Sequence, residues 1–260
     1  MNINKIKENL STKIVGKELI YNESVESTNK LLFEQAEKVL KDGTVFIADE
    51  QTGGKGRLGR SWYSPGGVNL YLSVLLCPEI NPQNSAVFTF IASLALQKTL
   101  QDLNISSQIK WPNDLLIKTK KVAGVLTEMK NEGNSLNFII VGIGLNINLS
   151  IESINENLAT ISSSVTSLSI EKNTLLEREE VAVKLIGFLD DYYLRFKYEG
   201  INSIVAEWSN SWGKLNEKIS VKVENKIYSG IARKVDNYGF LYIEDDKGNL
   251  EKIIAGDIQN

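Results

Sequence analysis

The residue types best suited to chemistry are concentrated between Gln51 and Trp62, in the stretch Gln-Thr-Gly-Gly-Lys-Gly-Arg-Leu-Gly-Arg-Ser-Trp. Its four glycines let the backbone adopt positive φ values and bring N–H groups close to a ligand. Three cations, Lys55, Arg57 and Arg60, lie among them. The stretch, called the glycine loop below, therefore predicts a binding site for phosphate or carboxylate; a flexible, solvated surface loop is the alternative interpretation.

Two known phosphate-binding motifs fit the glycine loop poorly. Residues 54–59 match G-x-G-x-x-G, and Glu79 follows about twenty residues later, as a dinucleotide site requires. That motif must open a helix, whereas here the loop continues through Trp62 and Pro65 into the strand-like run 68–76. A kinase loop does lie between strands but needs a His-Arg-Asp sequence, and this chain has no histidine.

The absence of histidine limits the mechanism. It excludes Ser-His-Asp and Cys-His nucleophile pairs and every His-ligated metal site. Catalysis is therefore expected to depend on charge, positioning, carboxylates and lysines, and any catalytic metal is expected to be an oxygen-liking ion such as magnesium. The single Cys77 closes no disulfide within the chain, which is typical of a reducing cytoplasm.

Composition argues against two classes of partner. The net charge of −3 gives no general attraction to nucleic acid. No apolar run approaches the ~20 residues that span a bilayer, and the polar start is unlike a signal peptide. We expect a soluble, cytoplasmic protein that binds neither membrane nor specific DNA.

Three further motifs suggest close approach to a ligand. Lys110-Trp-Pro-Asn-Asp114 ends a strand with a cation, an aromatic ring and a carboxylate. Lys121-Val-Ala-Gly124 places a lysine at the start of a strand with a glycine after it. Gly142-Ile-Gly-Leu-Asn146, continuing to Asn148, interrupts an apolar strand with two glycines, which weakens a strand unless another group must come close.

The remaining sequence predicts an α+β fold with a mixed or antiparallel sheet. Apolar spacing predicts helices from Ser27 or Thr28 to about residue 40, from Pro82 to 100, from a Thr174–Glu177 capping box to 200, and from 201 to 211. Strand-like runs cover 45–48, 68–76, 108–111, 115–117, 121–129 and 137–148. Residues 150–173 are expected to be irregular or short helix. Because helices and strands segregate more than they alternate, α+β is favoured over a doubly wound fold.

Three segments are expected: a short leader over residues 1–22, a main domain over 23–213, and a small β domain over 214–260. The last segment alternates apolar and polar residues and predicts a meander or barrel of about five strands. Its eight Lys and Arg residues are balanced by eight Asp and Glu residues, which favours a packing module over a nucleic-acid-binding barrel.

In this order, the motifs resemble those of the biotin protein ligases: Ser27-Thr-Asn29, Gly54-Lys-Gly-Arg-Leu-Gly-Arg-Ser-Trp62, Lys110-Trp-Pro-Asn-Asp114, Lys121-x-Ala-Gly124 and Gly142-x-Gly-x-Asn146. The resemblance covers residues 23–260. It implies a catalytic domain that shares its fold with lipoate ligases and class II aminoacyl-tRNA synthetases, followed by a Src-homology-3-like barrel. Lys55 departs from the pattern, since many relatives have Arg there.

The resemblance also implies roles for individual residues. The biotin ring would be held by Ser27, Thr28, Asn29 and Gln51. Lys55, Gly56 and Arg57 would close over biotin and the acyl phosphate, with Gly54 and Gly124 beside the biotin, and Lys121 would hold the biotin carboxylate and the phosphate. The ATP side would be formed by Arg57, Arg60, Trp62, Lys110, Asn113, Asp114, Lys121 and Asn146, with Asp114 as the magnesium ligand. Lys121, Arg57 and Asp114 would be the catalytic residues.

The implied activity is an ATP-dependent ligase that makes biotinyl-5′-AMP and transfers biotin to a lysine of a biotin carboxyl carrier protein. ATP and magnesium are its expected co-substrate and metal, biotin its substrate, and a homodimer is compatible with the sequence. A lipoate or octanoate ligase on the same fold is the nearest alternative, although such enzymes lack this glycine loop. A non-catalytic ligand-binding protein and an RNA-binding module are the alternatives from other classes.

Overall fold

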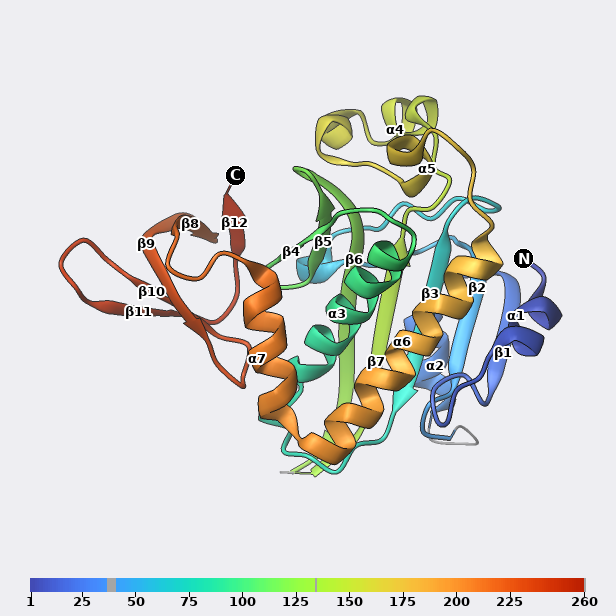
Figure 1. Cartoon of the computed structure of the whole chain (residues 1–260), viewed down its shortest axis with the longest axis horizontal. Coiled ribbons are helices and arrows are strands. Elements are labelled where there is room, and N and C mark those ends of the chain that lie inside the picture. Colours follow the sequence, from blue (N-terminus) through green and yellow to red (C-terminus); the bar gives the residue numbers. More distant parts are fainter. Residues whose placement is uncertain (37–40, 134, 260) are drawn as a thin grey trace.

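The computed structural model describes residues 1–36, 41–133 and 135–259. Seven strands form its main sheet, in the order β1-β2-β3-β7-β6-β5-β4 (Figure 1). The strands are β1 (Leu19–Val25), β2 (Val45–Gln51), β3 (Leu70–Leu76), β4 (Gln108–Lys110), β5 (Asp114–Ile117), β6 (Lys120–Glu132) and β7 (Ser135–Leu145). β1 and β2 are parallel, and the other neighbouring pairs are antiparallel. The predicted mixed sheet is confirmed.

Helices cover both faces of this sheet, and each covered face has its own core. The helices are α1 (Ile3–Asn9), α2 (Thr28–Gln35), α3 (Ala86–Asp102), α4 (Ile151–Asn157), α5 (Leu168–Lys172), α6 (Arg178–Glu199) and α7 (Ile201–Trp212). In Figure 1, α3 and α6 cross the front of the sheet, while α2 lies behind it. Leu72 and Val141 pack on the α3 and α6 side, whereas Leu75 and Ile140 pack with Leu32 of α2. The period-two alternation of β3 and β7 thus divides their side chains between two cores.

The N-terminal residues are part of the main domain. Ile6 of α1 is fully buried, and α1 packs against α6. The carboxylate of Asp190, itself buried in α6, accepts the backbone N–H groups of Lys13, Ile14 and Val15 at 2.6, 2.8 and 2.8 Å. Since β1 begins at Leu19, the boundary expected after residue 22 lies inside a strand of the sheet.

The C-terminal residues form a separate antiparallel sheet. Helix α7 ends at Trp212, Gly213 follows with a φ of 69°, and the strands are β8 (Lys218–Val223), β9 (Lys226–Val235), β10 (Leu241–Glu244), β11 (Leu250–Ile253) and β12 (Asp257–Gln259). Their order is β11-β10-β9-β8-β12, and among the residues described no pairing joins β11 to β12. The five strands expected for a meander or barrel are present, and among the residues described they pair as an open antiparallel sheet. Trp111 fastens this sheet to the main domain by donating its indole N–H to the Gly239 carbonyl at 3.0 Å.

Several local predictions have clear outcomes. Ser27 caps α2 by accepting the Lys30 N–H at 3.5 Å, while the expected end of this helix at residues 37–40 lies outside the described part of the chain.

The prediction of a capping box at Thr174–Glu177 is wrong. Thr174 N–H instead bonds the Ser169 carbonyl at 3.2 Å and closes α5, so α6 begins later, at Arg178. Residues 150–173 contain the short helices α4 and α5 and the 3₁₀ helix η3 (Ala159–Ser164).

Candidate active site

A cavity of about 770 Å³ lies where the glycine loop, the α2 start and the C-terminal sheet meet. Nearly all of the predicted site residues line it: Ser27, Thr28, Asn29, Gln51, Lys55, Gly56, Arg57, Arg60, Trp62, Lys110, Asn113, Asp114, Lys121, Gly124 and Asn146. Gly54 is the exception. It is buried, and a Cβ there would come within 2.4 Å of the Trp62 carbonyl oxygen, so this glycine permits the loop to fold back on itself.

One end of the cavity is uncharged, buried and rich in hydrogen-bonding groups. Ser27, Thr28 and Asn29 form the first turn of α2 and are 3–4% exposed. The side-chain oxygen of Gln51 accepts the Thr28 N–H at 2.9 Å and lies 3.1 Å from the Thr28 hydroxyl. Thr28 is therefore linked by its backbone and its side chain to Gln51, the last residue of β2, where the glycine loop starts.

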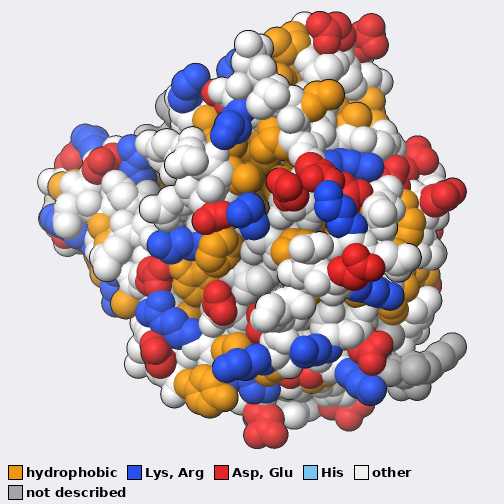
Figure 2. Space-filling model, turned by 45° about the vertical axis from the view of Figure 1, so that its right-hand side comes forward, with side chains coloured by type: hydrophobic (Ala, Val, Ile, Leu, Met, Phe, Trp, Pro, Cys, Tyr) orange, Lys and Arg blue, Asp and Glu red, His pale blue; other side chains and the backbone are white. Residues whose placement is uncertain are grey.

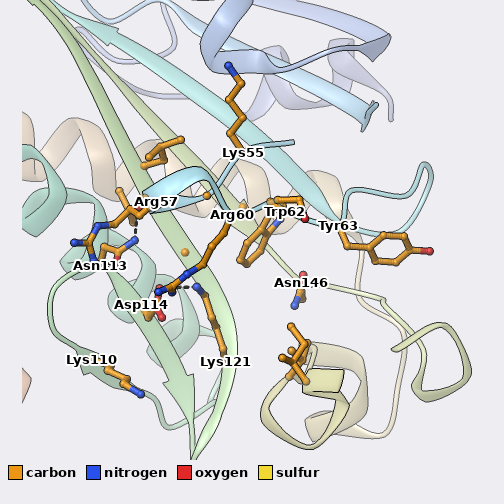
Figure 3. A pocket seen from close by; sticks show the side chains of 18 of the residues that line it. Lys55, Arg57, Arg60, Trp62, Tyr63, Lys110, Asn113, Asp114, Lys121 and Asn146 are labelled. Atoms are coloured by element: carbon orange, nitrogen blue, oxygen red, sulfur yellow. Dashed lines mark hydrogen bonds and ion pairs between the residues drawn. The ribbon is translucent and has the colours of Figure 1, made fainter. Parts of the chain in front are cut away.

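The other end of the cavity is dominated by cations. Figure 3 shows Lys121 and Asp114 turned toward each other, and their Nζ and Oδ1 atoms are 2.6 Å apart. Arg57 donates from Nη1 to the Asn113 side-chain oxygen at 3.1 Å, and Asn113 in turn donates to the Val125 carbonyl at 2.7 Å. Burial lowers the pKa of Arg57, but the group still carries its charge at neutral pH.

The lining carries a strong local excess of positive charge. Its cations are Lys55, Arg57, Arg60, Lys110, Lys121 and Lys222, and its carboxylates are Asp114 and Asp257. The chain as a whole has a net charge of −3, and on the face shown in Figure 2 charges of both signs are interspersed. The positive charge is thus local to the cavity, an arrangement that concentrates a polyanionic ligand there.

The glycines of the Gly142-x-Gly144 motif admit the protein's own side chains. A Cβ on Gly142 would lie 2.1 Å from Asn29 Oδ1, and one on Gly144 would lie 2.5 Å from the Trp62 ring. Trp62 therefore packs closely against β7, and Lys121 Nζ lies 5.1 Å from its ring centroid, a cation–π distance. The sequence predicted that another group must approach these glycines closely. In the structure the approaching groups are the side chains of Asn29 and Trp62.

Asn146 forms part of the cavity wall, although its amide is already engaged. The side-chain nitrogen donates to the Thr166 carbonyl at 3.1 Å, and the side-chain oxygen accepts from Asn69 at 3.3 Å. Asn146 is 4% exposed. Asn146 therefore links the end of β7 to Thr166, just before α5, at the edge of the cavity.

The C-terminal sheet contributes residues that sequence reasoning missed. Lys222 of β8 and Asp257, Ile258 and Gln259 of β12 line the cavity. Arg60 of the glycine loop forms an ion pair with Asp257. Burial raises the pKa of Asp257, but the Arg60 guanidinium outweighs burial and holds the pKa below its usual value. The balanced charge of residues 214–260 gave no sign of this contact, and only its position in space identifies it.

Across residues 1–36, 41–133 and 135–259, no group of three or more Cys, Asp or Glu side chains could hold a metal ion. Asp114 is the carboxylate on the cationic side that lies beside Lys121. The part of the chain that the structure describes also contains no helix long and apolar enough to cross a membrane.

Comparisons with known proteins agree with this geometry. Residues 21–146 match the family model described as "Biotin/lipoate A/B protein ligase family", and residues 214–259 match "Biotin protein ligase C terminal domain". The chain is 31% identical to the "Bifunctional ligase/repressor BirA" of Bacillus subtilis over 256 residues, which cover 98% of this chain and 78% of that protein. It is 27% identical to the "Biotin--[acetyl-CoA-carboxylase] ligase" of Mycobacterium tuberculosis, covering 84% and 79%.

A solved structure shares the whole architecture. The structure described as "Biotin protein ligase from Aquifex aeolicus in complex with biotin and ATP" superposes with a TM-score of 0.76 at 29% identity, covering 94% of this chain and 98% of that one.

Proposed function

This chain belongs to the biotin protein ligase family, and we propose that its cavity binds biotin at the α2 end and ATP at the cationic end. The enzyme is an ATP-dependent biotin protein ligase. The observation that supports the proposed placement is the single cavity that joins a buried, uncharged wall at Ser27–Asn29 to the cations around Lys121. A ring with N–H and C=O groups suits the first wall, and a carboxylate meeting a triphosphate suits the second.

In the first half-reaction the biotin carboxylate attacks the α-phosphorus of ATP, pyrophosphate leaves, and a mixed anhydride with AMP forms. Two anions must meet, which at ~4 Å and an effective dielectric near 20 costs about 4 kcal/mol. Arg57 and Lys121 lie where they can offset this repulsion. The attacking carboxylate is already ionised at neutral pH, because its reference pKa is about 4. No histidine base is needed.

In the second half-reaction an acceptor lysine attacks the acyl carbon, AMP leaves, and an amide bond forms. The lysine must arrive neutral, although its reference pKa is about 10.4. Asp114 is the group proposed to orient or deprotonate it, and its 2.6 Å contact with Lys121 keeps the carboxylate at the cavity. The proposed acceptor is a biotin carboxyl carrier protein or domain.

Asp114 also fits a role as a magnesium ligand. Magnesium at nucleotide sites usually takes one or two carboxylates together with substrate phosphates and water, so a single carboxylate is enough. When bound, the ion would neutralise phosphate charge. Lys121, Arg57 and Asn113 would still orient the reacting groups.

The test is direct. The protein, incubated with biotin, ATP, magnesium and a carrier domain, should increase the mass of the carrier by one biotinyl group on one lysine. Lipoate or octanoate in place of biotin should give no product. A matching increase with lipoate would instead support the alternative ligase on the same fold.

A further inference from the structure

The indole ring of Trp62 lies on two glycines of neighbouring strands. Gly124 of β6 and Gly144 of β7 are paired directly across the sheet. A Cβ on Gly144 would come within 2.5 Å of the ring, and a Cβ on Gly124 would come within 3.2 Å of Trp62 Cζ3. Residues paired across antiparallel strands face the same side of the sheet. The two glycines therefore form one platform, called the glycine platform below, that leaves room for the ring.

Close packing and backbone hydrogen bonds set the position of this ring. The Trp62 backbone N–H donates to the Gly54 carbonyl at 2.9 Å, and the Ser64 hydroxyl donates to the Trp62 carbonyl at 3.0 Å. Within the ranges that the structure describes, the indole N–H is buried and has no hydrogen-bond partner. The ring is therefore placed by the glycine platform beneath it and by the backbone of the glycine loop.

The Lys121 ammonium lies between this ring and a carboxylate (Figure 3). Asp114 of β5 is paired with Gly124, so Asp114, Gly124 and Gly144 form one row across three strands. A Cβ on Gly124 would lie 3.3 Å from Lys121 Nζ, which places the ammonium above the middle of this row. Nζ is 2.6 Å from Asp114 Oδ1 and 5.1 Å from the centroid of the Trp62 ring. The carboxylate thus attracts the ammonium from the β5 side and the ring attracts it from the β7 side.

Two attractions from different directions fix a flexible side chain better than one. A lysine has four rotatable carbons, and holding its ammonium in one place costs rotamer entropy. The ion pair with Asp114 alone would let Nζ move with the carboxylate, away from the middle of the row. The face of an indole carries negative charge density and attracts a cation. The ring also fills the space above Gly144, so Nζ is kept above Gly124.

We propose that Trp62 is a positioning residue that acts on the reaction through Lys121. This inference rests on the proposed function, which places the biotin carboxylate and the α-phosphate at Lys121. The ring belongs to the glycine loop, whereas the lysine belongs to β6, so the contact ties the position of the ammonium to the position of the loop. The contribution of Trp62 to the rate of adenylate formation passes through this contact and is separate from any contact of the ring with the nucleotide.

The first measurement is the single-turnover rate of pyrophosphate release at saturating biotin and ATP, without a carrier protein. Trp62→Leu removes the ring face but keeps an apolar side chain, and it should lower the saturated rate about 3- to 30-fold. Trp62→Phe keeps a ring face and should lose less. If the ring only stacks on the nucleotide base, Trp62→Leu should instead raise the KM for ATP and leave the saturated rate unchanged. That result would overturn the inference.

The decisive measurement combines Trp62→Leu with Lys121→Ala. If Trp62 acts through Lys121, removing the ring from an enzyme without the ammonium should change the saturated rate by less than about 2-fold. If the two effects multiply, Trp62 acts independently and the inference is wrong. The single variant Lys121→Ala tests the proposed function separately, because a near-normal rate in it would remove the role of Lys121 itself.

Gly144→Ala displaces the ring without changing it. The new Cβ would come within 2.5 Å of the Trp62 ring, so the ring must leave the glycine platform and the saturated rate should fall as in Trp62→Leu. Gly187→Ala is the matched control, because Gly187 lies on α6 and a Cβ there meets nothing within 4 Å. Its rate should stay within about 2-fold of the wild type. A normal rate in folded Gly144→Ala would contradict the inference. Should Gly144→Ala not fold, the combination of Trp62→Leu with Lys121→Ala still decides the question.

Discussion

Arg60 in the glycine loop and Asp257 in the last strand form an ion pair that joins the two sheets of the molecule across the cavity. A second contact, between Arg60 Nη1 and Asp257 Oδ1, measures 3.5 Å. Both residues line the cavity. The glycine loop is therefore anchored to the C-terminal sheet as well as to the sheet from which it emerges.

The Arg60–Asp257 pair should stabilise the protein in a pH-dependent way. Because the folded-state pKa of Asp257 is depressed, its contribution is present above the unfolded value of about 3.9 and is lost as the pH falls through the folded value. We expect Asp257→Asn to lower stability by less than about 1 kcal/mol at pH 7, since both partners are partly exposed. The difference in Tm between wild type and variant should shrink below pH 4. A difference that grows toward low pH would contradict this assignment.

Lys121→Ala should impair adenylate formation far more than stability. The ammonium lies where the biotin carboxylate and the α-phosphate are proposed to meet, and losing it should cost about 2 to 4 kcal/mol in the transition state, or about 30- to 1,000-fold in rate. Pyrophosphate release in the absence of a carrier protein measures this step. Lys118→Ala is the control, because Lys118 is exposed and pairs with Glu171 outside the cavity. A folded Lys121→Ala enzyme with near-normal release would rule out the role.

Arg57→Gly should let biotinyl-adenylate escape. Arg57 donates to Asn113 beside the cavity, so it is available to close the loop over the proposed mixed anhydride. We expect adenylate synthesis to continue in part while biotin appears on lysines of bystander proteins, measured by blotting a mixture with an unrelated protein. Leu58→Gly is the matched control. It adds a glycine to the same turn at an exposed position whose φ is already 55°, and it removes no charge. Equal bystander labelling by both variants would attribute the effect to loop flexibility alone.

Asp190→Ala should strongly destabilise the fold and leave the chemistry unaffected. The buried carboxylate satisfies three backbone N–H groups before β1, and its removal leaves them without partners. At about 1 to 3 kcal/mol for a buried unsatisfied group, the loss should be at least about 3 kcal/mol in urea unfolding. The neighbouring exposed Asp191→Ala should change stability by less than about 0.5 kcal/mol. Kinetics of the still-folded fraction should match the wild type.

The site was predictable from sequence where unusual residue types mark it. The clustered glycines and cations of residues 53–60 and the Lys110–Asp114 turn have few structural explanations, and the structure brings them together around one cavity. Asp257 was missed because it is an ordinary residue in an ordinary strand. Its importance comes from a contact with Arg60, which lies 197 positions away in sequence. Such contacts depend on the packing of the sheets, which local patterns do not encode.

The fold shows the same division. Periodicity identified the long helices and the alternating strands, because burial on one face leaves a repeat in the sequence. Periodicity did not reveal the parallel pairing of β1 with β2. Two parallel strands are not joined by a tight turn, so their pairing depends on tertiary packing. Periodicity also did not show that Thr174 ends α5 and does not begin α6. The hydrogen bond from Thr174 N–H to the Ser169 carbonyl and the predicted cap toward Glu177 both span only a few residues, so the local sequence does not distinguish them.

The position of β12 has a consequence for how the enzyme is made. Residues from Ser27 to Gln259 line one cavity, so the first and last parts of the site lie almost a full chain apart. A ribosome adds roughly 5 to 20 residues per second and presents the N-terminal residues first. The residues that form the uncharged wall and the helices up to α7 therefore leave the ribosome before Asp257 is available to hold the glycine loop. The cavity is therefore expected to be complete only after synthesis has passed β12.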